Sequence, residues 1–182
     1  MSLIASVFIV TSLDGFIARE DGALDWLDAA NKRVPEGEDC GYVPFLDSVD
    51  ALVMGRNTYE KVLTLGPWPY KDKSVIVLSS RPLKIPVDLR KTVEHSSESP
   101  KELFDRFSEE GFKRLYIDGG TTIRRFLTEG LINDITITVS PVIIGRGISL
   151  FGGLTQDISL MHVNTKIYDF GFIQSTYQVK KI

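Results

Sequence analysis

Three short segments place glycine, hydroxyl and arginine residues directly after apolar runs of the sequence. They are Gly55-Arg56 in "ALVMGRNTYE", 79–81 in "IVLSSR" and 119–122 in "YIDGGTTIRR". Helix starts carry unpaired N–H groups and partial positive charge, and arginine adds a forked cation, so each segment could bind a phosphate group. Ligands of open α/β sheets bind outside the carboxyl ends of strands, so this recurrence favours a nucleotide site.

Each segment has its own expected part in that site. Gly55 permits close approach of the backbone, and a helix is expected from Asn57 or Thr58. The hydroxyls and guanidinium of 79–81 suit a phosphate monoester, such as the 2′-phosphate that separates NADP from NAD. Taken singly, each segment is more often an ordinary turn, and the sequence lacks the G-x-G-x-x-G and P-loop patterns.

Four aspartates are candidates for handling a proton, namely Asp14, Asp25, Asp28 and Asp118. Asp118 ends an apolar run beside the third segment, and burial there would raise its pKa toward a useful value. We rank it first, as catalytic acid and substrate contact, although bonding to the glycine turn is the plainer alternative. Asp14 is the second catalytic candidate, but an aspartate before glycine is as typical of a turn. Asp25 and its neighbour Leu24 are further predicted substrate contacts.

Composition and charge exclude several classes of protein. The 182 residues, 43% hydrophobic and 25% charged, predict one soluble globular domain over 1–182. A net charge of −3 with scattered basic residues gives a nucleic-acid partner no support. The single Cys40 excludes an internal disulfide and fits a reducing compartment, and the isolated His95 and His162 predict no metal site. The N-terminal apolar run lacks a basic flank and reaches Asp14 too soon for a signal peptide or membrane span, so we expect a cytoplasmic protein.

Apolar patterning predicts the elements that hold these residues. Strands are expected at 3–11, 51–54, 74–80, 92–95, 113–118 and 134–144, with two more around 169–171. Helices are expected at 26–31, 45–50, 56–63, 101–110 and 121–129, with Ser99 and Glu102 as a capping box. The order predicts an α/β fold with a mixed, mostly parallel sheet and antiparallel strands at the C-terminus. The segment 32–44 is predicted to be a loop or lid.

The ordered set "SLDGFIA", "GALDW", "DALVMGRNTYE", "VIVLSSR", "YIDGGTTIRRFL" and "LINDITITVSPVIIGRGISLF" resembles the dihydrofolate reductase superfamily. It is most similar to the reductase domain of the bifunctional riboflavin-biosynthesis deaminase–reductase (the RibD C-terminal domain) and its free-standing relatives. The resemblance covers about residues 3–180, and the combination is far more specific than any one motif. It implies a mixed sheet of about eight strands flanked by helices, NADPH as hydride donor and a homodimer.

The resemblance also implies roles for particular residues. The phosphates of NADPH would be held by Gly55, Arg56 and Thr58. The 2′-phosphate end would meet Ser79, Ser80 and Arg81. The pyrophosphate would lie on Gly119, Gly120, Thr121 and Thr122, with Ile123 close by. The nicotinamide would lie beside Ala5, Ile17 and Trp26.

Departures from the family patterns leave the substrate open. The chain has "TYEKVLTLGPWP" where riboflavin-pathway reductases carry Asp-Asp-Pro, and Asp25-Trp26 replaces the "PW" dipeptide of dihydrofolate reductases. We therefore expect an NADPH-dependent reductase that acts on an imine- or carbonyl-type carbon of a small pteridine, ribosylaminopyrimidine or related heterocycle. Two alternatives stay open, namely an NADP-binding module without turnover and a protein for another mononucleotide.

Overall fold

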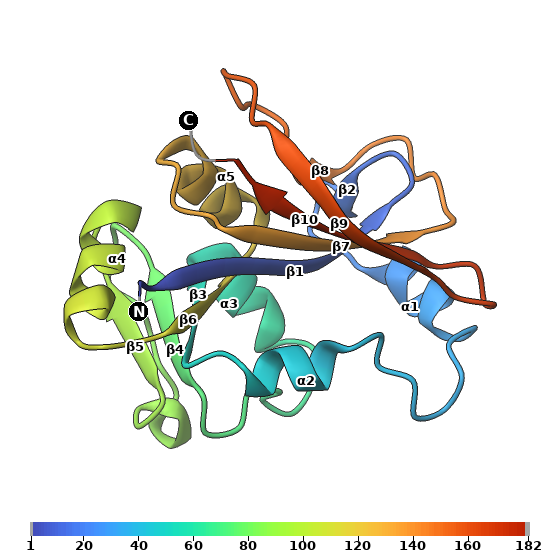
Figure 1. Cartoon of the computed structure of the whole chain (residues 1–182). Helices are drawn as coiled ribbons and strands as arrows, with labels where there is room; N and C mark the ends of the chain where they lie inside the picture. Colours follow the sequence, from blue (N-terminus) through green and yellow to red (C-terminus); the bar gives the residue numbers. More distant parts are fainter. Residues whose placement is uncertain (1, 181–182) are drawn as a thin grey trace.

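The computed structural model of the chain describes residues 2–180. An eight-stranded sheet forms its centre, with the strand order β5-β4-β3-β6-β1-β7-β10-β9 (Figure 1). These strands are β1 Ile4–Ser12, β3 Ala51–Gly55, β4 Ser74–Leu78, β5 Val93–Ser96, β6 Arg114–Asp118, β7 Asp134–Ser140, β9 Leu160–Ile167 and β10 Ile173–Val179. A separate two-stranded sheet pairs β2 Phe16–Ala18 with β8 Ile148–Ser149.

One strand of the large sheet, β10, runs opposite to the other seven. All neighbouring pairs from β5 to β7 are parallel, whereas the pairs β7–β10 and β10–β9 are antiparallel. The unbroken apolar run of β1 fits its place between two parallel neighbours, because such a strand is covered on both faces. The predicted mixed sheet with antiparallel C-terminal strands is confirmed.

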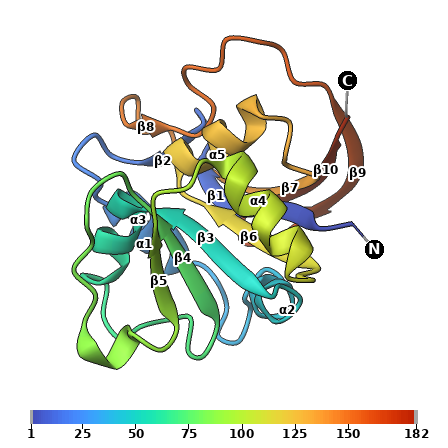
Figure 2. The ribbon, with the colours of Figure 1, turned by 90° about the vertical axis from the view of Figure 1, so that its left-hand side faces the viewer.

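Helices pack on both faces of the sheet and form one large apolar core with it on each face. They are α1 Asp25–Asn31, α2 Tyr42–Asp47, α3 Arg56–Val62, α4 Pro100–Glu109 and α5 Gly120–Thr128, with a short 3-10 helix η1 at Val87–Leu89. Helix α1 contributes to a third, smaller cluster. Successive side chains of β3 point to opposite faces of the sheet. Ala51 and Val53 pack under α4 and α5, whereas Leu52 and Met54 pack against α2 and α3. Figure 2 shows α4 and α5 together on one face.

Local sequence signals explain where several elements begin and end. In α4, Ser99 Oγ accepts the Glu102 N–H at 3.3 Å and Glu102 Oε2 accepts the Ser99 N–H at 2.8 Å, so the predicted capping box is confirmed. The strand predicted over 134–144 ends at Ser140, because Pro141 has no N–H with which to continue the ladder.

The segment 32–44 is a loop only as far as Gly41. The Asp39 carboxylate accepts the N–H groups of Gly41 and Val43 at 2.8 and 3.0 Å, and so caps α2 from Tyr42 onward. The helix therefore starts three residues earlier than its apolar pattern predicts. Within residues 2–180, none of the helices is long and apolar enough to span a membrane.

Candidate functional site

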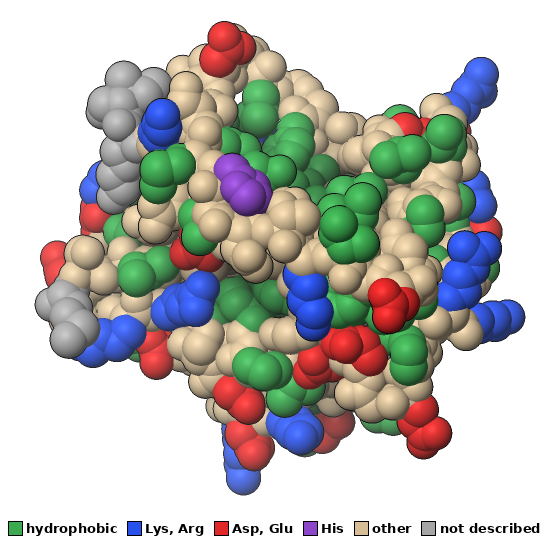
Figure 3. Space-filling model, turned by 45° about the vertical axis from the view of Figure 1, so that its right-hand side comes forward, with side chains coloured by type: hydrophobic (Ala, Val, Ile, Leu, Met, Phe, Trp, Pro, Cys, Tyr) green, Lys and Arg blue, Asp and Glu red, His purple; other side chains and the backbone are tan. Residues whose placement is uncertain are grey.

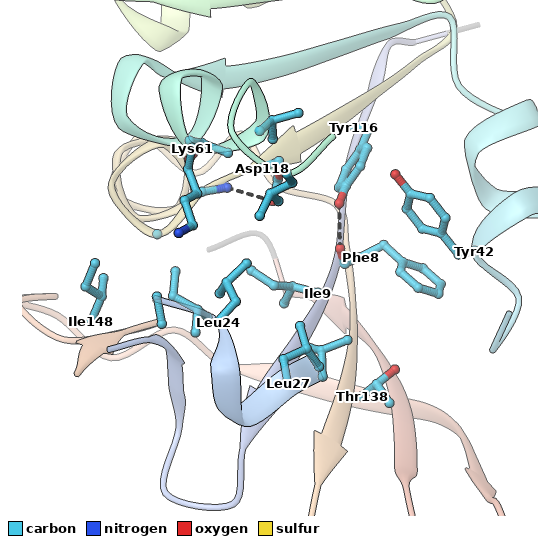
Figure 4. A pocket seen from close by; sticks show the side chains of 18 of the residues that line it. Phe8, Ile9, Leu24, Leu27, Tyr42, Lys61, Tyr116, Asp118, Thr138 and Ile148 are labelled. Carbon is cyan, nitrogen blue, oxygen red and sulfur yellow. Dashed lines mark hydrogen bonds between the residues drawn. The ribbon is translucent and has the colours of Figure 1, made fainter. Parts of the chain in front are cut away.

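A cavity of about 890 Å³ lies where the carboxyl ends of β3, β6 and β1 meet α1, α3 and α5. This is the place where open α/β sheets bind their ligands. Figure 4 shows Asp118 and Lys61 on one side of it, with Tyr42 and Phe8 on another. Ten of the predicted site residues line it: Ile17, Leu24, Gly55, Arg56, Thr58, Asp118, Gly119, Gly120, Thr121 and Thr122.

The turn between β6 and α5 exposes backbone donors to the cavity. Gly119 has a φ of +85°, a conformation that side chains disfavour, and no side chain caps the helix that follows. The N–H groups of Gly120, Thr121 and Thr122 belong to the first turn of α5, where helix geometry provides no acceptor. Their partial positive charge suits an anion.

Two glycines let the start of α3 and the start of α5 pack directly together. A Cβ at Gly119 would collide with Thr58 Oγ1, and a Cβ at Gly55 would lie 3.0 Å from Thr122 Oγ1. Each glycine thus faces a threonine of the other helix start. The two predicted phosphate segments therefore form one continuous surface, which fits a pyrophosphate group.

Arg56 is largely committed to protein partners. Its Nε donates to Ser79 Oγ at 3.0 Å, Nη2 donates to the carbonyls of Arg81 and Pro82 at 2.7 and 2.6 Å, and Nη1 donates to Glu60 at 3.1 Å. Since a guanidinium has five N–H groups, one donor is left for a ligand. Arg56 therefore joins the end of β4 to α3.

The predicted 2′-phosphate segment lies beyond the cavity. Ser79 is half-buried and hydrogen-bonded to Arg56, whereas Ser80 and Arg81 are exposed. None of the three residues lines the cavity, and their role in binding a 2′-phosphate stays a prediction.

Asp118 is a half-buried carboxylate at the end of β6. Its Oδ1 accepts the Gly119 N–H at 2.8 Å, which links the acid to the glycine turn. Burial raises the pKa of Asp118 to about 6, against the lowering effect of that hydrogen bond. The side chain can therefore exchange a proton with a ligand near neutral pH.

Aromatic side chains surround the cavity next to this acid. The ring centres of Phe8 and Tyr42 lie 5.8 Å apart, and the Tyr116 hydroxyl donates to the Phe8 carbonyl at 2.9 Å. Burial, and then the negative charge of Asp118, raise the pKa of Tyr42 to about 12. Flat apolar faces beside one carboxylate suit a planar heterocyclic ligand.

Two residues expected beside the cofactor are instead in the core. Ala5 and Ile123 are fully buried among apolar side chains and do not line the cavity. Ala5 lies near the amino end of β1, away from the ligand edge, and the part of β1 that reaches the cavity is Phe8 to Val10. Ile123 points under α5 into the sheet core. Both predictions of cofactor contact stay predictions, and the position of the two side chains in the core does not support them.

Three further predicted residues also lie outside the cavity. The Asp14 carboxylate accepts from Ser12 Oγ at 2.6 Å and from the N–H groups of Ile144 and Gly145 at 3.2 and 2.7 Å, so it joins two loops. Asp25 forms an exposed ion pair with Arg19 at 2.6 Å.

Trp26 is the third. It is 4% exposed and packs inward from α1, while Leu24 and Leu27 on either side of it line the cavity. The catalytic role of Asp14, the substrate contact of Asp25 and the nicotinamide contact of Trp26 therefore stay predictions that the cavity lining does not support.

Several lining residues escaped the sequence reasoning. Among them are Phe8, Tyr42, Lys61, Arg125 and Thr138, whereas the segment 32–44, predicted as a loop or lid, contributes Val34, Pro35, Glu38, Asp39 and Cys40. Lys61 lies one turn after Asn57 and Thr58, so its helical spacing was a usable signal. The others are brought in by tertiary packing. Among residues 2–180, no cluster of histidine, cysteine, aspartate or glutamate could hold a metal ion.

Known proteins resemble this chain over most of its length. A protein of Bacillus subtilis, YwjB, is 38% identical over 163 residues, which cover 88% of this chain and 89% of YwjB. A crystal structure from Shewanella sp. PV-4, described as a candidate riboflavin biosynthesis protein, has 38% identity and a TM-score of 0.91, covering 98% of this chain and 100% of that one.

A more distant likeness defines the class of fold. Dihydrofolate reductase from Enterococcus faecalis, solved with NADP(H), superposes with a TM-score of 0.63 at 16% identity, covering 98% of this chain and 97% of that one. The fold is therefore that of the dihydrofolate reductase-like proteins. The family model for the RibD C-terminal domain matches residues 4–171, and the chain belongs to this family.

Proposed function

We propose that the protein is an NADPH-dependent reductase. When bound, NADPH would supply a hydride to an imine- or carbonyl-type carbon of a small heterocycle, in the manner of a ribosylaminopyrimidine reductase or a dihydrofolate reductase. The observation that carries this proposal is a cavity that joins the Gly119–Thr122 turn to a half-buried acid of raised pKa and to aromatic walls. A cytoplasmic location is proposed with it, in line with the one cysteine of the chain.

The residues of the chain divide the work between binding and proton supply. Gly119 and Gly55 leave room for phosphate oxygens against the first turn of α5, whose N–H groups would donate to them. Tyr42 and Phe8 would hold a planar ring. Asp118 would donate the proton that must accompany the hydride, since burial keeps part of it protonated near neutral pH.

We predict that the protein binds NADPH about tenfold or more tightly than NADH, because a 2′-phosphate gains charge-assisted hydrogen bonds at 79–81. Arg81→Ala should remove most of this preference while leaving NADH affinity unchanged. Fluorescence titration with both nucleotides measures it. Lys91→Ala, at another exposed cation, is the control. Equal affinity of the unmutated protein for the two nucleotides would remove the assigned role of 79–81.

Turnover is tested with a panel of acceptors. Purified protein is mixed with NADPH and with dihydrofolate, a ribosylaminopyrimidine or small carbonyl compounds, and loss of the reduced nicotinamide absorbance is followed. Oxidation with one acceptor supports the reductase. Tight NADPH binding with no oxidation across the panel favours the NADP-binding module without turnover.

We also propose that a second copy of the chain covers β9. Every residue of this edge strand is exposed, including Met161, Val163 and, at 75% exposure, Ile167. Figure 3 shows hydrophobic side chains gathered around a histidine on the face that comes forward in that view. An uncovered edge strand exposes backbone N–H and C=O groups that can pair with a strand of another chain, and natural proteins usually cover or block such edges.

A charge on β9 should separate the two copies. Val163→Lys is expected to convert a dimer to a monomer, because pairing would bury the new ammonium group. Light scattering during gel filtration measures the mass. Val87→Lys, at a 76% exposed valine of η1 near the opposite edge, is the control and should stay dimeric. A monomeric unmutated protein would contradict the proposal.

A further inference from the structure

One wall of the cavity is a loop with little regular structure. Residues 34–40 between α1 and α2, here called the loop wall, contribute Val34, Pro35, Glu38, Asp39 and Cys40 to the lining. Their own hydrogen bonds are local: Glu38 Oε1 accepts the Cys40 N–H at 2.7 Å, and Asp39 accepts from the start of α2. These bonds shape the loop wall but do not attach it to the sheet.

A single side-chain amide provides an attachment. Gln174, on β10, donates from Nε2 to the Cys40 carbonyl at 2.9 Å and to Thr138 Oγ1 at 2.9 Å. A backbone carbonyl can only accept, so the amide nitrogen, not its oxygen, must face Cys40. Among the backbone and side-chain hydrogen bonds of residues 2–180, this is the bond that joins the backbone of the loop wall to a strand of the sheet, while the Cys40 thiol is itself hydrogen-bonded to the Tyr168 side chain just after β9.

The backbone of Cys40 shows that the loop wall is held by its surroundings. Cys40 has a φ of +54°, one of two non-glycine residues with positive φ in the described chain. A side chain disfavours this region, so the conformation persists only where neighbours impose it. Beside the Gln174 bond, those neighbours are the aromatic residues Tyr168, Phe170 and Phe172 of the β9–β10 turn.

The two acceptors of Gln174 belong to different parts of the same cavity. Thr138 is 1% exposed, lies on β7 directly opposite Gln174 and lines the cavity. Cys40 lines the cavity from the loop wall. The amide therefore fixes the distance between the loop wall and β7, and with it the width of the cavity beside Phe8 and Tyr42.

We infer that Gln174 is a positioning residue that sets the width of the substrate end of the cavity by holding the loop wall against Thr138. The identification of that end as the substrate end rests on the proposed function. The attachment itself does not rest on it. Gln174 acts through Cys40 and Thr138 and is not itself among the lining residues.

The chain contains one cysteine, so the thiol of Cys40 reports on the loop wall directly. In the intact protein the thiol is half-buried, and burial raises its pKa, so a disulfide reagent should react slowly. Gln174→Leu removes both bonds and should speed this reaction by about tenfold, as expected for two neutral hydrogen bonds. Gln178→Leu, at an exposed glutamine of the same strand, is the control and should match the unmutated protein.

Two additional measurements keep the test decisive. Thr138→Val removes one of the two bonds and keeps β10 intact, so its thiol should react at an intermediate rate even if Gln174→Leu fails to fold. Each rate is also compared with that of the urea-unfolded chain. An unmutated thiol that reacts as fast as the unfolded one, or folded Gln174 and Thr138 variants that react like the unmutated protein, would overturn the inference.

A kinetic measurement separates this inference from the proposed function. With the acceptor that passes the panel, Gln174→Leu should raise KM by about tenfold and leave NADPH affinity unchanged, since only the substrate end widens. A faster thiol reaction without any turnover in the unmutated protein would support the attachment and count against the reductase. Unchanged KM together with a faster thiol reaction would contradict the substrate-end role of Gln174.

Discussion

Asp118→Asn is expected to lower kcat by about 10²- to 10⁴-fold, the usual contribution of a positioned general acid. The amide keeps the size of the side chain and can still accept the Gly119 N–H, so the glycine turn should keep its shape. NADPH affinity should therefore stay within about threefold of the unmutated value. Steady-state kinetics and a nucleotide titration on the same preparation measure both quantities. Asp88→Asn, at an exposed aspartate of η1 that does not line the cavity, is the control.

The pH dependence gives the same residue a second test. Burial raises the pKa of Asp118 to about 6, and the acid donates its proton only when protonated. The value of kcat should therefore fall as pH rises above about 6, approaching tenfold per pH unit. A profile that is flat from pH 5 to pH 8 in the unmutated protein would exclude Asp118 as the proton donor.

The same raised pKa predicts that the free energy of unfolding also falls as pH rises, and that Asp118→Asn gains stability although it loses activity. A carboxyl group whose pKa is raised on folding stabilises the protein fully below its unfolded pKa, and this stability is lost as pH rises through the folded value. For Asp118, a rise from 3.8 to about 6 means that up to about 3 kcal/mol is lost by pH 8. Asp118→Asn carries no such cost and should be the more stable protein at pH 8 in urea unfolding. A less stable variant at that pH would contradict the desolvation of Asp118.

Gly119→Ala is expected to damage both the fold and the cofactor site. The positive φ of Gly119 disfavours any side chain, and a Cβ there would collide with Thr58 Oγ1. The free energy of unfolding should fall by about 2–4 kcal/mol. Displacement of the first turn of α5 should weaken NADPH binding by about a hundredfold. Urea unfolding and nucleotide titration measure the two effects.

Matched variants separate the collision from the backbone strain. Gly130→Ala, at the other end of α5, meets a φ of +66° but has nothing within 4 Å, so it should cost about 1 kcal/mol and leave NADPH binding intact. Thr58→Ala in the Gly119→Ala background removes the colliding oxygen and should recover part of the lost stability. If Gly119→Ala and Gly130→Ala behave alike, the packing of the two helix starts is not essential.

The sequence predicted the scaffold because its signals are local. Ser99 and Glu102 mark the start of α4, and the glycines at 119 and 120 mark the junction of β6 with α5. The continuous apolar run at the N-terminus identified β1 as a central strand. Such a run carries no alternation, however, and so does not show which residues reach the ligand edge. Ala5, predicted to lie beside the cofactor, is therefore five residues from the lining residue Val10.

Residues that meet only through tertiary packing were beyond such reasoning. Tyr42 and Lys61 reach one cavity from α2 and α3, and Gln174 meets Cys40 across 134 residues of chain. Asp14 shows the converse, since its neighbour Gly15 suggested a turn, and its two distant amide partners are visible only in the fold. Local patterns thus locate strand ends, and packing decides which side chains share a cavity.

The most direct test of the central claim is a crystal structure of the protein with NADP⁺ bound. We predict that the pyrophosphate lies on the first turn of α5 against Gly119 and Gly55, that the 2′-phosphate lies near Arg81, and that the nicotinamide ring reaches toward Asp118. A dinucleotide bound elsewhere, or a nicotinamide that points away from Asp118, would contradict the account.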